Sequence, residues 1–159
     1  MESAPTNSHP KLYGAISFLA IVGLTDSIYL WIKHLTGEDV TCVASSGCSE
    51  VLSSSYSKIG SIPLGAVGAL GYFIAFSLAL LTAFGSTKAR TLLRLQVTGM
   101  FCVTLWLLYV QAFILHAFCD YCLLSAALTT TITLLVVISW FLGKQQQSIG
   151  NLSPTTGLR

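Results

Sequence analysis

Hydrophobic residues fall in four long runs along the chain, and shorter polar stretches separate them. Each run reaches the roughly 20 residues that a helix needs to cross about 30 Å of hydrocarbon. The last three runs carry no charged residue, and the first carries only Asp26. Because a helix satisfies its own backbone hydrogen bonds, which lipid cannot do, the pattern predicts an all-α membrane protein. The expected four-transmembrane-helix bundle has the spans Leu12–Ile32, Ile62–Phe84, Gln96–Leu115 and Tyr121–Leu142.

The composition agrees with this membrane class. The chain is 53% hydrophobic and 9% charged, with a mean hydropathy of +0.75, whereas soluble domains carry about 25% charged residues. The net charge of +2 is too small to indicate a nucleic-acid partner. We expect one membrane domain over residues 11–143, between a flexible N-terminal tail (residues 1–10) and a flexible C-terminal tail (residues 144–159) rich in Gln, Ser and Thr.

Basic residues are shared unevenly between the two ends of the predicted bundle. Lys33 and Lys58 lie in the loop between the first two spans, and the other six lie in the tails and the loop between spans two and three. Cytoplasmic segments carry the excess of Lys and Arg, so the termini are expected in the cytoplasm and the opposite end in the periplasm or a lumen. The six are Lys11, Lys88, Arg90, Arg94, Lys144 and Arg159.

Cys119 and Cys122 form a Cys-x-x-Cys pair at the start of the fourth span. Residues three apart share one face of a helix. The partial positive charge of a helix N-terminus stabilises a thiolate, which is the nucleophile of thiol–disulfide exchange, although Asp120 would partly oppose this effect. The pair therefore predicts redox chemistry, and a structural disulfide or half of a metal site are the alternatives.

A second pair, Cys42 and Cys48, lies in the first outward loop. Taken alone, it either staples the loop or relays electrons from an external thiol protein to Cys119. Its place beside the Cys-x-x-Cys pair, in an oxidising compartment, favours the relay. The alternatives are a zinc site made from all four thiols and a disulfide-stapled structural membrane protein without redox turnover. The spacing of the loop pair exceeds that of common zinc sites, so zinc ranks below redox.

Two residues inside the spans carry chemistry of their own. Cys102 lies about 25 Å from Cys119 along a helix axis, too far for a disulfide, so we expect a small buried hydrophobic residue. Asp26 lies about 9 Å from the outer end of its span, where a carboxyl is costly and often functional. It either supplies protons or hydrogen bonds to a ligand, or is a protonated carboxyl held by Ser or Thr of a neighbouring helix.

The loop after the second cysteine pair predicts a short amphipathic helix at the membrane surface. Val51, Leu52, Tyr56 and Ile59 recur there at helical spacing among serines. Such a helix either caps a pocket or is an ordinary loop helix without a ligand.

Several short segments together resemble the vitamin K epoxide reductase family, especially its bacterial members. Their order and their placement relative to the four spans make the combination specific, and the resemblance covers most of the chain. The segments are Cys42, Gly47 to Tyr56 (Gly-Cys-Ser-Glu-Val-Leu-Ser-Ser-Ser-Tyr), Gly60 to Leu64 (Gly-Ser-Ile-Pro-Leu) and Phe118 to Cys122 (Phe-Cys-Asp-Tyr-Cys).

The resemblance implies a bundle around a quinone pocket near the outer face, and a thiol:quinone oxidoreductase that supports disulfide-bond formation. Ubiquinone, menaquinone or a related quinone would be the substrate, and no metal is implied. Cys122 would react with the quinone and Cys119 would exchange with Cys48. Cys42 would pair with Cys48 and receive electrons from a thioredoxin-like protein on the outward side. The residues that match the family's quinone pocket are Ser54, Val51, Leu52, Tyr56, Leu115 and Phe118.

Two departures from the family refine this expectation. Vertebrate members carry a tyrosine where this chain has Ala126, so a plain quinone is expected rather than vitamin K epoxide. Many bacterial members continue into a fifth helix and a fused thioredoxin-like domain, whereas this sequence ends at Arg159. We therefore expect a separate partner protein, or a longer parent chain.

Overall fold

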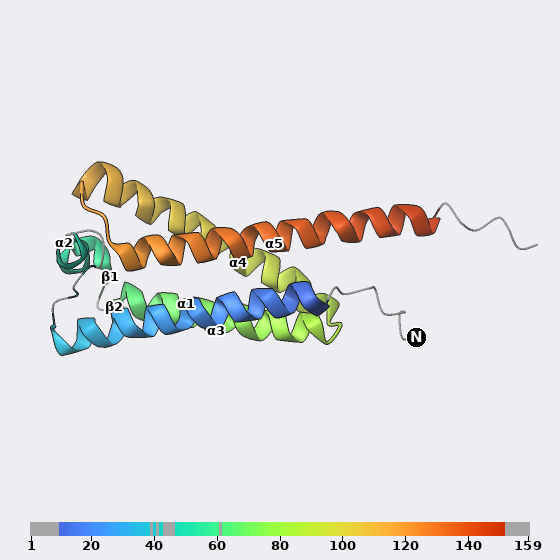
Figure 1. Cartoon of the computed structure of the whole chain (residues 1–159), viewed down its shortest axis with the longest axis horizontal. Coiled ribbons are helices and arrows are strands. Elements are labelled where there is room, and N and C mark those ends of the chain that lie inside the picture. The colour runs from blue at the N-terminus through green and yellow to red at the C-terminus, as the bar shows by residue number, and fades with distance from the viewer. Residues whose placement is uncertain (1–9, 39, 41, 43–46, 61, 152–159) are drawn as a thin grey trace, which may run out of the picture.

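In the described part of the chain, three of the four long helices run along the bundle and the fourth crosses it obliquely, and several small elements lie at one end (Figure 1). The structure is a computed structural model that describes residues 10–38, 40, 42, 47–60 and 62–151, so the tail predictions for residues 1–9 and 152–159 lie outside the described residues. The long helices are α1 (Pro10–Thr36), α3 (Leu64–Ala83), α4 (Thr87–Tyr109) and α5 (Asp120–Asn151), and α4 continues into a π-helical turn, η2 (Val110–Leu115). The small elements are α2 (Cys48–Ser53), the 3₁₀ turn η1 (Ser55–Ser57) and the antiparallel strands β1 (Lys58–Ile59) and β2 (Ile62–Pro63).

The prediction of four spans is confirmed, because four helices among the residues that the structure describes are long and apolar enough to cross a membrane. The helices nevertheless extend past the charge-free runs. The α4 helix begins at Thr87 rather than at Gln96, since the Oγ of Ser86 accepts a hydrogen bond from the Ala89 N–H at 3.4 Å and caps the helix. The absence of charge therefore marks where lipid surrounds a helix and not where the helix ends.

The predicted surface helix is present as α2, but it ends at Ser53. Ser54 has an extended backbone, and its Oγ donates to the Val51 carbonyl at 2.7 Å. Serine hydroxyls that bond to nearby backbone carbonyls compete with helix propagation. Tyr56 consequently lies in η1 and Ile59 in β1, where the sequence pattern had predicted further helix.

The α1 and α3 helices approach each other closely because glycines face their contact. A Cβ built on Gly65 would lie 2.9 Å from the Trp31 backbone nitrogen, and a Cβ on Gly23 would lie 2.4 Å from the Tyr72 ring. Small residues let helix backbones come together in this way. The contact holds the Tyr72 ring firmly against α1, which matters for the cavity described below.

Within the part of the chain that the structure describes, two packed clusters lie towards opposite ends of the bundle. The first joins all four long helices and is built around Ile16, Tyr72, Leu93 and Ile132. The second contains the cysteine pairs and joins the outer ends of the helices to α2. Its buried members are Leu30, Val40, Cys48, Val51, Ala117 and Cys119.

The expected burial of Cys102 is wrong, because its side chain is exposed on the surface of the bundle. Most of the residues around it in α4 are apolar, so the sequence pattern does not mark which face of this helix turns inward. On a membrane-spanning helix an exposed apolar position faces lipid, which places this thiol away from the packed cysteine cluster.

Candidate active site

Cys42 and Cys48 form a disulfide, with Cα atoms 5.6 Å apart. Cys48 is the first residue of α2 and is 1% exposed. A disulfide can be opened by an attacking thiolate, which then forms a mixed disulfide with one of its sulfurs. The first loop therefore holds an oxidised pair that is chemically able to accept electrons.

Cys119 and Cys122 lie at the start of α5, and both thiols are free. Cys119 directly precedes the helix, and its carbonyl accepts the Leu123 N–H at 2.9 Å. Cys119 is fully buried, whereas Cys122 lines a cavity. The two sulfurs thus face different surroundings, although they belong to neighbouring turns of the chain.

The surroundings of Cys119 favour its thiolate form. A hydrogen bond from the Cys122 thiol, together with bonds from the backbone N–H groups of Cys122 and Tyr121, lowers the pKa of Cys119 from 9.0 to about 7. Burial and the nearby carboxylate of Asp120 act in the opposite direction. The Cys119 thiol therefore ionises at a lower pH than a free cysteine does.

This environment predicts a measurable titration. In a protein that keeps only Cys119 and Cys122, we expect the ultraviolet absorbance of the thiolate to appear with a midpoint near pH 7. Because the pKa is depressed, the thiolate is present above that pH and is lost as the pH falls through it. Cys122→Ala removes the largest cause and should move the midpoint towards 9.0. An unchanged midpoint in Cys122→Ala would contradict this assignment.

The two cysteine pairs share one packed cluster because the loop runs against the chain that leads to Cys119. A Cβ built on Gly47 would lie 2.8 Å from the Phe118 carbonyl oxygen, so glycine is needed for this approach. The approach brings Cys48, the next residue, into the cluster that contains Cys119. The cysteines that pack against the buried members of this cluster are Cys42 and Cys122.

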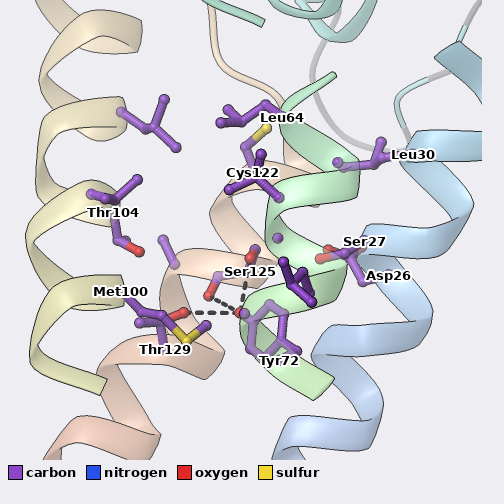
Figure 2. A pocket seen from close by; sticks show the side chains of 18 of the residues that line it. Asp26, Ser27, Leu30, Leu64, Tyr72, Met100, Thr104, Cys122, Ser125 and Thr129 are labelled. Atoms are coloured by element: carbon purple, nitrogen blue, oxygen red, sulfur yellow. Dashed lines mark hydrogen bonds between the residues drawn. The ribbon is translucent and has the colours of Figure 1, made fainter. Parts of the chain in front are cut away.

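A cavity of about 730 Å³ opens between the four long helices beneath α2 (Figure 2). Its lining is mainly apolar with a few polar groups, which is typical of small-molecule sites. Phe118 does not line it and is 45% exposed. The predicted residues that do line it are Asp26, Val51, Leu52, Ser54, Tyr56, Leu115 and Cys122.

A hydroxyl cluster that the sequence analysis missed lies in the same cavity. The Tyr72 hydroxyl lies 2.9 Å from the Ser125 carbonyl oxygen, 2.9 Å from the Ser125 Oγ and 2.9 Å from the Thr129 Oγ1 (Figure 2). The sequence offers no signal for Tyr72, because its span contains other aromatic residues in equally apolar surroundings. The cluster places polar groups about one and two turns along α5 from Cys122.

Asp26 lies in the cavity wall beside Ser27 (Figure 2) and is 9% exposed. Its Oδ2 atom is buried and has no hydrogen-bond partner within the described part of the chain. No Ser or Thr of the described residues holds this atom. Since an unsatisfied buried oxygen costs about 1–3 kcal/mol, a group entering the cavity would gain by bonding to it.

The described residues contain no cluster of three His, Cys, Asp or Glu side chains that could hold a metal ion. Two of the four sulfurs that a zinc site would need are also joined in the Cys42–Cys48 disulfide. The geometry at this end of the bundle is thus that of one disulfide facing one dithiol.

Comparison with known proteins agrees with these observations. Residues 15–138 match the vitamin K epoxide reductase family. The chain is also 29% identical over 136 residues to the thiol-disulfide oxidoreductase LTO1 of Arabidopsis thaliana, a match that covers 80% of this chain and 36% of that protein. The chain thus spans about a third of the length of this relative. It belongs to the vitamin K epoxide reductase family and is an integral membrane protein.

Proposed function

We propose that the protein is a membrane thiol:quinone oxidoreductase, which oxidises a thioredoxin-like dithiol protein, reduces a quinone and so supports disulfide-bond formation. One observation carries this proposal. Cys119 packs in the cluster that contains Cys48, while Cys122 lines the cavity. A dithiol with one sulfur in the cluster and the other at the cavity can pass two electrons from the loop to a molecule in the cavity.

The electrons pass through successive exchanges. A partner dithiol opens the Cys42–Cys48 disulfide and leaves as a disulfide. The Cys48 thiolate then attacks a Cys119–Cys122 disulfide at Cys119, and Cys42 resolves the mixed disulfide. This step leaves the loop pair oxidised and the Cys-x-x-Cys pair reduced, which is the combination found here.

The quinone is reduced in the last exchange. The Cys122 sulfur adds to a ring carbon as its thiol proton leaves, and the Cys119 thiolate then attacks the Cys122 sulfur. A disulfide forms as the carbon–sulfur bond breaks, and hydroquinone leaves. In total the dithiol gives two electrons and two protons to the quinone. The lowered pKa of Cys119 supports its role as the resolving nucleophile.

The shape of the cavity supports a lipid-soluble quinone such as ubiquinone, menaquinone or a relative. Lining residues extend along α4 and η2 from Leu92 to Gln111, a distance of about 28 Å at the rise of a helix. A long, apolar lining suits a ring near Cys122 with a hydrocarbon tail along α4. Ala126 also lines the cavity, so this position offers no phenol group to an epoxide oxygen.

The charge distribution supports an outward position for the cysteine pairs. The α3–α4 turn lies at the end of the bundle away from α2 (Figure 1), and Lys88, Arg90 and Arg94 follow that turn in α4. By the positive-inside rule this end faces the cytoplasm. The loop disulfide then faces a periplasm or lumen, where a thioredoxin-like partner would dock.

A thiol count tests the proposed function directly. Purified, fully reduced protein should lose two or four of its five cysteine thiols when a ubiquinone or menaquinone analogue is added without oxygen. The same protein without quinone serves as the control. A constant thiol count, beside a working quinone reductase as positive control, would reject the proposal.

Asp26 is proposed to assist quinone reduction by supplying a proton or a hydrogen bond to a quinone oxygen. Asp26→Asn keeps the size of the side chain but removes its acid, so turnover should fall on the order of 100-fold and lose part of its pH dependence. Quinone reduction across a pH series measures both. Glu38→Gln, at an exposed loop carboxylate bonded to Lys33, is the matched control. Unchanged turnover with an unchanged pH profile would exclude this role.

A further inference from the structure

A buried amide connects the cavity to the Cys-x-x-Cys pair. Gln111, in η2, is 3% exposed and lines the cavity. Its Oε1 accepts the Cys119 N–H at 3.2 Å, and its backbone carbonyl accepts the N–H groups of His116 and of Ala117. Gln111 therefore accepts hydrogen bonds from three backbone N–H groups of the segment that leads to the dithiol.

The local backbone explains why Gln111 can make these contacts. The π-helical turn widens the end of α4, a distortion that is frequent at functional sites. His116 follows in the left-handed region (φ 50°, ψ 28°), which is uncommon for a residue other than glycine. Together they turn the chain back across the helix end, so that Cys119 meets the side chain of Gln111.

The chemistry of the amide fixes which way it points. Since the Cys119 N–H is a donor, the atom that faces it must be the amide oxygen. The Nε2 atom then carries two N–H donors, and neither bonds to another residue in the part of the chain that the structure describes. The cavity that Gln111 lines also holds the Cys122 sulfur, so a ligand there is the available acceptor.

We propose that Gln111 donates a hydrogen bond to a quinone carbonyl oxygen while its Oε1 positions Cys119. The inference rests on the quinone reduction proposed above. When Cys122 adds to the ring, negative charge develops on a carbonyl oxygen, and a fixed N–H donor stabilises that charge. Because the same amide oxygen binds the Cys119 backbone N–H, it also holds the resolving Cys119 thiolate in position beside Cys122 and the quinone ring.

Two substitutions separate these roles. Gln111→Glu keeps an oxygen for the Cys119 N–H but, once ionised, has no donor for the quinone. Gln111→Met has a similar size and provides neither. Gln145→Leu, at an exposed glutamine near the end of α5, is the control. Two rates are measured at mildly alkaline pH: reduction of the Cys119–Cys122 disulfide by dithiothreitol without quinone, and reduction of a menaquinone analogue.

The donor role predicts that Gln111→Glu retains the dithiothreitol rate and loses on the order of 100-fold in kcat/KM for the quinone. Gln111→Met should lose both rates, and Gln145→Leu should lose neither. Wild-type kcat/KM in both Gln111 variants would reject this inference alone. Absence of quinone reduction in the wild-type protein would reject the proposed function and this inference together.

A spectroscopic measurement reads the hydrogen bond itself. A menaquinone analogue with one isotope-labelled carbonyl is bound to Cys122→Ser, where no turnover competes. Infrared spectra of Cys122→Ser should show a carbonyl stretching frequency below that of the unbound quinone. The double variant that combines Cys122→Ser with Gln111→Glu should lose this shift. Equal carbonyl frequencies in the two backgrounds, for each carbonyl labelled in turn, would overturn the inference.

Discussion

Cys122→Ser should reduce quinone turnover to the rate of the uncatalysed reaction. The Cys122 sulfur is the thiol that lines the cavity, and a serine hydroxyl neither adds readily to the ring nor forms a disulfide with Cys119. The cavity itself should stay intact, because the change is small. Turnover is measured as anaerobic reduction of a quinone with dithiothreitol as the electron donor, and quinone binding is measured on the same sample.

The matched control for this variant is Cys102→Ser. It makes the same chemical change at an exposed thiol outside the cavity and outside the cysteine cluster, so turnover should stay at the wild-type level. Intact binding with lost turnover would assign Cys122 to the chemistry. Measurable turnover in Cys122→Ser above the background rate would remove Cys122 from the mechanism.

Cys42→Ala should separate two ways of feeding electrons into the protein. With a thioredoxin-like dithiol protein as donor, quinone reduction should fall to background, because Cys48 alone cannot complete a two-sulfur exchange. With dithiothreitol as donor, turnover should remain near the wild-type rate, since a small molecule can reach the Cys-x-x-Cys pair without the loop. The measurement is the ratio of the two rates in one preparation.

This second prediction tests whether the loop pair relays electrons or only staples the loop. A staple predicts that both rates fall together, in proportion to any loss of folded protein, or that neither falls. Cys102→Ala makes the same substitution at an exposed cysteine outside the cluster, and it should leave both rates unchanged. Wild-type coupling to the protein donor in Cys42→Ala would show that the relay is wrong.

The spans could be predicted from sequence because a long charge-free run has few other physical solutions. The ends of these helices could not be predicted, because the Ser86 cap lets α4 begin within a basic segment, before the charge-free run. The position of Cys102 could not be predicted either, because an apolar helix in lipid has no polar face to mark its exposed side. The surface helix was predicted too long, since serine hydroxyls compete for the carbonyls that it needed.

Within the candidate site, the cysteines and most pocket residues could be expected from their spacing and from the family resemblance. Gln111 and Tyr72 could not. Tyr72 bonds to Ser125 and Thr129, which are distant in sequence and are brought near only by the fold. Gln111 bonds to the backbone of Cys119, eight residues on, only because the π-helical turn and the left-handed His116 fold the chain back. Periodicity reports which residues share a face, but it does not report which polar group another element brings to it.

The cavity lies among the spanning helices, so for the proposed reaction the substrate concentration is set by the bilayer and not by the surrounding water. The relevant quantity is the mole fraction of quinone in the lipid. Added empty lipid, mixed into the same vesicles, dilutes the substrate and lowers the rate below saturation, whereas added buffer changes nothing. If the proposed reaction holds, its Michaelis constant is a ratio of quinone to lipid, and the turnover rate would differ between membranes that contain different amounts of quinone.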